Sequence, residues 1–413
     1  MKILAPALVL LAACAPSPAP VPVSAAATAS LDTAAAVRPG IETFLADVPP
    51  ALRGKRVGLI TNQSGIDRAR NSDIDLIARH PQLRLTALLA PEHGIRGTAE
   101  AGERIDDETD PSTGVRIHSL YTSEDNGPTE EMLREVDVLV YDLQEVGGRT
   151  WTYVSTMALA MRAAARKGIP FVVLDRPNPI GGEIVEGALL DPRFASFVGK
   201  YPIPARHGMT VGELATLFNR QHGIGVELIV ARVANWRRSQ WMDETGLPWV
   251  NPSPNLRSLA ALTSYPGAVY FEGTNLSEGR GTDRPFEQVG APWLDAPATA
   301  RAMNDMRLPG IRFEAITMPV TASKFAGQTI PAIRFVVTDR LAYRPVRTSL
   351  LLIDEIRGRH PRDFAWSGTI DRLTGSDRVR LAIEGGRLPA LLEEWDREAA
   401  AFKESSRPFL LYP

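Results

Sequence analysis

The stretch Leu85-Thr86-Ala87-Leu88-Leu89-Ala90 leads directly into Pro91-Glu92-His93-Gly94-Ile95-Arg96-Gly97, which predicts an apolar strand ending in a glycine-bounded turn. In open α/β sheets, ligands bind beyond the carboxyl ends of the strands, where loops can hold ionisable groups. Glu92 is therefore the first candidate for a catalytic residue, with His93 beside it. A structural turn, in which Glu92 caps a helix and His93 satisfies a carbonyl, explains this segment equally well.

From Lys55 onward, short apolar runs alternate with amphipathic segments, a pattern typical of a parallel sheet with helices on both faces. The near-continuous apolarity of Val138–Tyr141 and Phe171–Leu174 fits strands that are buried on both sides. We therefore predict an α/β fold. The expected strands are residues 57–61, 83–90, 136–143, 171–175 and 226–230, and the expected helices between them are 74–79 and 153–167.

Four predicted strands end in polar clusters, at residues 61–65, 91–94, 142–149 and 175–182. The carboxyl ends of parallel strands meet at one edge of a sheet, so these clusters should converge. Asn, Asp, Gly and Pro also form ordinary turns for local reasons. Four clusters in succession, each with side chains beyond the usual turn formers, favour a functional site.

The character of the chain changes after about residue 230, where tryptophans crowd together and two polar, glycine- and asparagine-containing segments follow. Apparent strands at 311–313 and 333–338 mix with helices at 349–357 and 388–403, which predicts an α+β region. We therefore expect a sheet domain over residues 35–230 and a smaller α+β domain over residues 231–413.

The length and charge of the chain limit the possible functions. Its 413 residues predict two domains, or one domain with a large addition. With 46 Lys and Arg against 48 Asp and Glu, no general field attracts a polyanion, and nucleic acid is not an expected partner. The sequence does not indicate an oligomeric state.

Cofactor and nucleophile motifs are missing from the sequence. Thr61-Asn62-Gln63-Ser64-Gly65 stands where Gly-x-Gly-x-x-Gly would open the first helix, and no P-loop or His-Glu-x-x-His occurs. The histidines are scattered, so we expect neither a cofactor nor a metal. Without a Gly-x-Ser-x-Gly elbow or a candidate cysteine nucleophile, ester or amide hydrolysis has no support.

The N-terminus has the features of an export signal, with Lys2 followed by the apolar residues 3–13. Leu11-Ala12-Ala13-Cys14 resembles a bacterial lipobox, and Cys14 is the single cysteine of the chain. We predict a signal peptide over residues 1–13, lipidation at Cys14 and a Pro/Ala-rich tether over residues 14–34. Ala15 after the cysteine favours the outer membrane, with the protein facing the periplasm.

Glycoside hydrolysis needs a carboxylic acid to protonate the leaving oxygen and a second group at the anomeric carbon. Glu92, Glu145 and Glu272 each follow an apolar run and stand near Gly, Asn, Thr or Arg. For Glu145 and Glu272 the alternative is a structural ion pair with Arg149 or Arg280. Sequence spacing does not give the separation of the carboxylates, so retaining and inverting outcomes both stay open.

Long motifs in fixed order resemble the NamZ-type exo-β-N-acetylmuramidases of peptidoglycan turnover, over residues 52–412. The motifs are VGLITNQSG (57–65), PEHGIRG (91–97), LDRPNP (174–179), RHGMT (206–210), NPSPN (251–255), EGTN (272–275) and GRGT (279–282). The chain departs from the usual pattern in residues 144–153, where we expect Asp at 145, Ala at 148 and an aromatic residue at 150. A longer acid and a displaced aromatic residue there would alter substrate preference.

The resemblance implies a Rossmann-like domain, a smaller C-terminal domain and a cleft between them. The implied reaction removes terminal N-acetylmuramic acid from the non-reducing ends of peptidoglycan fragments or muropeptides. Glu92 matches the glutamate of the family's Pro-Glu-His-Gly motif. We expect it to act as the general acid, kept protonated by apolar neighbours such as Leu89 and oriented by His93 or Asn62.

The remaining roles are assigned as hypotheses. Glu145, Glu272 or the substrate's own acetamido oxygen would serve as the second group, with Asn178, Asn255 or Asn275 positioning the amide. N-Acetylmuramic acid carries a lactyl carboxylate, so Arg149, Arg206 or Arg280 would bind it bidentately, unless all three pair with acidic neighbours. Further expected substrate contacts are Tyr153, Asp175, His207, Asn251, Ser253 and Thr274. The alternative function is a non-catalytic envelope lipoprotein that binds glycan ends.

Overall fold

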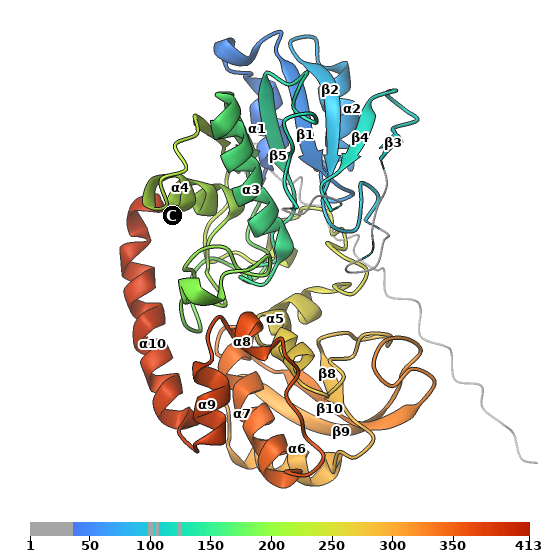
Figure 1. Cartoon of the computed structure of the whole chain (residues 1–413), viewed down its shortest axis with the longest axis vertical. Helices are drawn as coiled ribbons and strands as arrows, with labels where there is room; N and C mark the ends of the chain where they lie inside the picture. Colours follow the sequence, from blue (N-terminus) through green and yellow to red (C-terminus); the bar gives the residue numbers. More distant parts are fainter. Residues whose placement is uncertain (1–35, 98–102, 104–106, 122–125) are drawn as a thin grey trace, which may run out of the picture. The chain divides into compact units, whose positions relative to one another are not determined.

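The largest element of the computed structural model is a seven-stranded sheet; the structure describes residues 36–97, 103, 107–121 and 126–413 (Figure 1). Its strands are β1 (Arg56–Thr61), β2 (Arg84–Ala90), β3 (Glu108–Thr109), β4 (Arg116–Ser119), β5 (Val138–Asp142), β6 (Phe171–Leu174) and β7 (Leu228–Ala231). All neighbouring strands pair in parallel except the short edge strand β3, which runs antiparallel to β4. The α/β class is confirmed.

The strand order β3-β4-β2-β1-β5-β6-β7 reverses direction at β1. From β1 the chain adds β2 and β4 on one side and then returns to add β5, β6 and β7 on the other. The crevice between the ends of β1 and β5 is therefore the topological switch point, where open α/β sheets bind their ligands.

Helices cover both faces of this sheet. They are α1 (Gly40–Ala46), α2 (Asp73–Arg79), α3 (Thr152–Lys167) and α4 (Val211–Gln221). Val138 and Val140 of β5 belong to the apolar core that includes α1 and α2. Leu139 and Tyr141, which point the other way, belong to the core that includes α3 and α4. This two-sided burial explains why the strands are apolar along their whole length.

The C-terminal part is built on a three-stranded antiparallel sheet of order β8-β10-β9 (Figure 1). Its strands are β8 (Gln288–Gly290), β9 (Ile311–Pro319) and β10 (Thr329–Val337). The helices are α5 (Leu259–Ala268), α6 (Ala296–Asp305), α7 (Pro345–Arg359), α8 (Ile370–Thr374), α9 (Arg378–Glu384) and α10 (Leu388–Ser405). The apolar core around α3 and α4 continues into this part, so residues 36–413 form one unit.

The five strands and two helices predicted for the first part are confirmed to within about two residues at most ends. The α+β character of the second part is also confirmed. The domain boundary at residue 230 stays a prediction, and β7 ends at Ala231. The predicted signal peptide, lipidated Cys14 and tether lie outside the described residues. Within those residues, no helix is both long and apolar enough to span a bilayer.

Candidate active site

A cavity with about 580 Å³ of empty volume lies between the end of β2, the start of α3 and the C-terminal part. Half of the lining residues are apolar or aromatic, and the other half are polar or charged. It consists of Glu92, His93, Thr150, Trp151, Thr152, Val198, Ser253, Leu256, Tyr265, Val269, Glu272, Arg280, Phe286 and Leu373.

Glu92 is buried, with 7% of its surface exposed, and follows the last residue of β2 by two positions. Its Oε2 accepts a hydrogen bond from Thr152 Oγ1 at 2.6 Å. Its main-chain carbonyl accepts from the Tyr153 hydroxyl at 3.2 Å, and Asn62 Nδ2 donates to that hydroxyl oxygen at 2.8 Å. Asn62 therefore supports the Glu92 backbone through Tyr153, while Thr152 contacts the carboxylate.

Tyr121 also contacts Glu92. Burial, the charge of the Glu92 carboxylate and a hydrogen bond to it raise the pKa of Tyr121 to about 12. The ring lies 6.0 Å from that of Phe197. Tyr121 thus keeps its hydroxyl proton across the physiological range.

Two non-glycine residues of the lining have left-handed backbone conformations, His93 with φ 73° and Phe286 with φ 65°. Such conformations are costly for side chains with a Cβ and persist where the surrounding structure imposes them. Gly94 follows His93 with φ 76°, so the turn after β2 is built from two successive left-handed residues. Backbone strain of this kind is concentrated at functional sites.

Glu272 and Arg280 line the cavity from the C-terminal part and form an ion pair with 2.8 Å between Oε1 and Nη2. Burial and the negative charge of Glu278 raise the pKa of Glu272, and Arg280 opposes this shift. Arg280 Nε also lies 3.2 Å from Glu278 Oε1, and its guanidinium lies over the Phe286 ring. Arg280 is therefore shared between two carboxylates.

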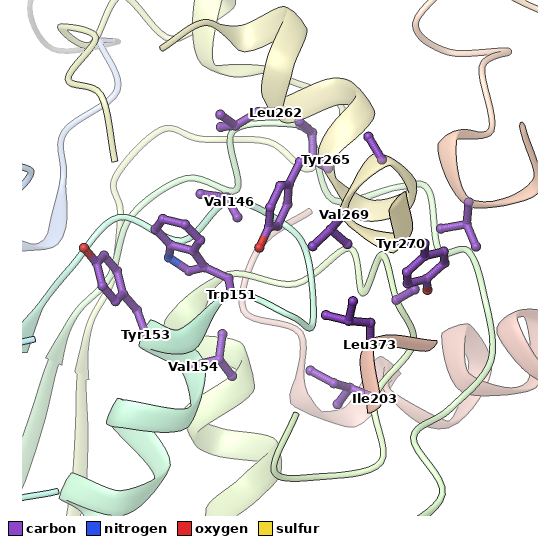
Figure 2. Close-up of a cluster of buried hydrophobic side chains, with 14 of the residues drawn as sticks. Val146, Trp151, Tyr153, Val154, Ile203, Leu262, Tyr265, Val269, Tyr270 and Leu373 are labelled. Atoms are coloured by element: carbon purple, nitrogen blue, oxygen red, sulfur yellow. The ribbon is translucent and has the colours of Figure 1, made fainter. Parts of the chain in front are cut away.

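Aromatic rings form one wall of the cavity, with Trp151 between Tyr153 and Tyr265 (Figure 2). The Tyr265 hydroxyl oxygen accepts from Thr150 Oγ1 at 3.3 Å, which leaves its own proton available to donate. Burial raises the pKa of Tyr265, and the charges of Glu272 and Glu92 raise it further. The Tyr265 hydroxyl is therefore close enough for the charges of both carboxylates to affect its pKa.

Five of the residues predicted from the sequence meet at this cavity: Glu92, His93, Ser253, Glu272 and Arg280. Arg149 and Arg206 do not line it. The Arg149 guanidinium donates to the carbonyls of Ala188, Ile203 and Leu373, at 3.0, 3.2 and 3.1 Å. Arg206 donates to the Ile180 carbonyl and lies over Trp241. Arg149 is therefore held by main-chain carbonyls, whereas Nε and Nη1 of Arg206 are buried without a hydrogen-bond partner among the described residues.

The predicted pairing of Glu145 with Arg149 is replaced by a contact with His207. His207 Nε2 lies 3.1 Å from Glu145 Oε1, and both side chains are buried away from the cavity. Because His207 Nδ1 accepts from the Met209 amide, the proton is on Nε2. This pair joins the loop after β5 to the segment before α4.

The other predicted contacts do not line this cavity and have structural partners. Asp175 accepts from Thr210 Oγ1, the Gly212 amide and the Tyr412 hydroxyl. Asn178 and Asn275 bond main-chain groups at Met209 and Ile180, and at Asp363 and Ala365. Asn251 accepts from Trp249 Nε1, Thr274 donates to the Phe271 carbonyl, and the Asn255 amide donates to Ser253 Oγ.

Sequence reasoning did not identify Thr152, Tyr265 or Tyr121. Thr152 had a signal, since Thr150-Trp151-Thr152 stands between a strand-end cluster and a predicted helix, where hydroxyl side chains face the site. Tyr121 follows the end of β4 by two positions, but this short strand was not predicted. Tyr265 had no signal, because it lies on α5 in the second half of the chain.

The fold and the cavity together define an α/β protein whose carboxylates face a sugar-sized site at the strand ends, an arrangement suited to glycoside hydrolysis. Residues 57–260 match the family model described as "Exo-beta-N-acetylmuramidase NamZ, N-terminal", and residues 263–412 match its C-terminal counterpart. The chain therefore belongs to the NamZ family.

Individual relatives agree with this assignment. The chain is 43% identical over 379 residues to the peptidoglycan β-N-acetylmuramidase NamZ of Bacillus subtilis (strain 168), with 91% of each protein covered. Crystal structures of two DUF1343 family proteins from Bacteroides fragilis NCTC 9343 share its fold. One has a TM-score of 0.85 at 32% identity and covers 92% of this chain and all of its own. The other has a TM-score of 0.71 at 30% identity, with 91% and 99% covered.

Proposed function

We propose that this chain is an exo-acting β-N-acetylmuramidase that releases N-acetylmuramic acid from the non-reducing ends of peptidoglycan fragments. Its family membership and its 43% identity to the B. subtilis enzyme support this activity. The observation that carries the mechanism is the buried Glu92 carboxyl, which lines a closed-in cavity and is held by Thr152.

Glu92 acts as the general acid. It transfers its proton to the leaving glycosidic oxygen as the bond from the anomeric carbon to that oxygen breaks. Water then adds its oxygen to the anomeric carbon, and the proton that the water releases restores the Glu92 carboxyl group. Thr152 and Tyr121 fix the carboxyl so that the proton points into the cavity. Among the described lining residues Glu272 is the second carboxylate, and it stabilises the positive charge that develops at the anomeric carbon.

Arg280 selects the muramic sugar through its lactyl carboxylate. It is the one arginine on the described lining of this cavity, and a guanidinium binds a carboxylate in a planar, bidentate manner. Glu272 and Glu278 both pair with Arg280 and offset its positive charge. Recognition of the lactyl carboxylate therefore depends on the planar geometry of the guanidinium as well as on its charge. A glucosamine substrate lacks this carboxylate and would lose the interaction.

The test uses a chromogenic β-N-acetylmuramide beside the matching glucosaminide. We expect turnover of the muramide, and Glu92→Gln should lower kcat by about 10²–10⁴-fold while binding of the sugar is retained. Glu393→Gln, at an exposed position on α10, is the matched control and should leave kcat unchanged. A parent protein that binds the sugar without releasing it would instead be a non-catalytic binder.

We further propose that the mature protein is tethered to the cell envelope, in the outer membrane, by lipid on Cys14. The lipobox-like sequence before Cys14 and the proline-rich segment after it support this proposal. Replacing Cys14 by Ala should move the protein from the membrane fraction to the soluble periplasmic fraction. A variant that stays with the membrane would contradict the lipid anchor.

A further inference from the structure

A second cavity, with about 450 Å³ of empty volume, lies at the topological switch point of the sheet. The mechanism above uses none of its residues. Its lining comes from the segments after β1, β5 and β6, together with residues 242–252, Pro39 and Leu262 of α5. It thus occupies the place where this class of sheet ordinarily binds a ligand.

Gln144 offers an acceptor to this second cavity. The side chain is buried, with 8% exposed, and its Nε2 donates to the carbonyls of Glu145 and Pro177 at 2.8 and 3.0 Å. No described residue bonds its Oε1, and this atom is not sealed from solvent. The amide is therefore fixed at one end with its acceptor open.

Arg176 offers a donor beside it. The side chain is 5% exposed, and its Nη2 donates to Asp142 Oδ2 at 2.9 Å and to the Ile66 carbonyl at 3.0 Å. Its Nη1 has no partner among the described residues and also keeps contact with solvent. Asp142 already balances the charge of the guanidinium, and Asp67 lines the same cavity. The open donor is therefore suited to a neutral oxygen rather than an anion.

The rest of the lining is largely apolar. Leu247, Pro248, Trp249 and Val250 form a continuous stretch of it, joined by Met242, Pro252 and Leu262. Trp249 Nε1 already donates to Asn251 Oδ1 at 2.7 Å, so the ring contributes apolar surface. One donor, one acceptor and an apolar wall match a secondary amide next to a methyl or methylene group.

We propose that the switch-point cavity binds a secondary amide of the peptidoglycan fragment, outside the sugar that is cleaved. The amide N–H donates to Gln144 Oε1 and its carbonyl accepts from Arg176 Nη1, while the adjoining alkyl group packs against Trp249. This inference rests on the proposed function for the nature of the substrate. Two sources supply such a group: the acetamido group of a second amino sugar and a peptide bond of the stem.

The two cavities are close enough to share one fragment. Pro252 lines the switch-point cavity and the next residue, Ser253, lines the catalytic one. A chain of hydrogen bonds also joins them: Tyr153 links the Glu92 carbonyl to Asn62, and Asn62 accepts from Ser64 Oγ. Ser64 Oγ in turn accepts from the Gln144 amide at 3.1 Å.

The test measures binding in the Glu92→Gln protein, so that it does not depend on turnover. It is titrated calorimetrically with methyl β-N-acetylmuramide, with the disaccharide of N-acetylmuramic acid and N-acetylglucosamine, and with muramyl dipeptide. In muramyl dipeptide the lactyl group is an amide and offers Arg280 a carbonyl oxygen in place of the carboxylate, so each Kd is compared with that of the Glu92→Gln protein for the same ligand. Adding Gln144→Leu or Trp249→Ala should raise Kd about tenfold for one of the two larger ligands, the loss expected for a hydrogen bond or an aromatic contact. The Kd of the monosaccharide should stay the same. The Trp249→Phe variant should bind the larger ligands with the same Kd as the protein that keeps Trp249.

The pattern of losses identifies the amide. A loss confined to the disaccharide assigns the acetamido group of the second sugar, and a loss confined to muramyl dipeptide assigns the peptide bond. Unchanged Kd values for both larger ligands, or equal losses for all three, overturn the inference. Failure of the proposed function is separate, because it appears as absent turnover in the parent protein.

Discussion

Thr152, the first residue of helix α3, donates a hydrogen bond from its hydroxyl group to the Glu92 carboxyl group, with 2.6 Å between Oγ1 and Oε2. The acid is thereby held between the end of a buried strand and the start of a 16-residue helix. Both are rigid elements, and sites built on such elements hold their geometry more closely than sites on loops. The positive end of the α3 dipole also lies next to this carboxyl group.

Replacing Thr152 by Val removes this donor without changing the size of the side chain. We expect kcat on the chromogenic muramide to fall about tenfold, in keeping with the loss of one charge-assisted hydrogen bond. The basic limb of the pH–rate profile should move to higher pH, because the ionised carboxylate loses a partner. Thr152→Ser should restore both values.

Thr156→Val is the control for that experiment, since Thr156 lies one turn further along α3 and donates to the Thr152 carbonyl. It should leave the pH–rate profile in place. An equal shift in both variants would mean that the helix, and not the hydroxyl, sets the profile.

Arg280→Gln should lower kcat/KM for the muramide by at least tenfold more than for the glucosaminide, because only the muramide carries the lactyl carboxylate. The same change leaves Glu272 and Glu278 without their shared cation. Arg280→Gln combined with Glu278→Gln relieves this repulsion and should keep the altered sugar preference. Equal losses on both sugars in the double variant would reject the lactyl role.

Arg149 gives the opposite expectation. Its guanidinium bonds three carbonyls and joins the loop after β5 to Leu373, so Arg149→Leu leaves buried acceptors unpaired. The free energy of unfolding should fall by about 3 kcal/mol or more, measured by urea denaturation. The ratio of muramide to glucosaminide kcat/KM should not change. Arg397→Leu, at an exposed position, is the control for loss of charge.

The stability of the protein should fall as pH rises through neutrality. Burial raises the pKa of Glu186 to about 7 and that of Asp175 to about 7, against ordinary values of 4.5 and 3.8. The folded protein therefore keeps protons that the unfolded chain has released. This stabilisation is complete below about pH 4 and is lost as the pH rises to about 7.

Glu186→Gln tests this sign at one site, because Gln mimics the protonated acid and can still accept from the Arg347 amide. Between pH 5 and pH 7 the free energy of unfolding of the parent should decline by roughly 1.4 kcal/mol per pH unit for each such group. The variant should show a smaller decline. A parent that gains stability over this interval would contradict the assignment.

The main sheet could be predicted because strands that are covered on both faces consist mostly of apolar residues, which the sequence shows as short apolar runs. β1, β2, β5, β6 and β7 are such runs. β3 and β4 were not predicted, since they are short: β3 has two exposed residues, and β4 has four residues of which two are buried. Helix α4 was also not predicted, although Thr210 and Glu213 form a capping box that marks its start.

The site was predictable only where a residue's role follows from its position on a strand. Glu92 stands at the end of β2, which the sequence displays directly. Whether an arginine faces a cavity or a set of carbonyls is decided by residues hundreds of positions away, as Leu373 shows for Arg149. Sequence alone therefore named three arginines, of which the structure places one at the cavity.

The hydrogen bond from Tyr412 to Asp175 has a consequence for how the protein folds. The acid that follows β6 pairs with a residue 237 positions further along the chain, and the Pro413 carbonyl accepts from the Arg238 amide. The seven-stranded sheet can therefore complete its buried contacts only once this distant segment has docked. Truncations that remove Tyr412 should destabilise the sheet around Asp175, far from the point of truncation.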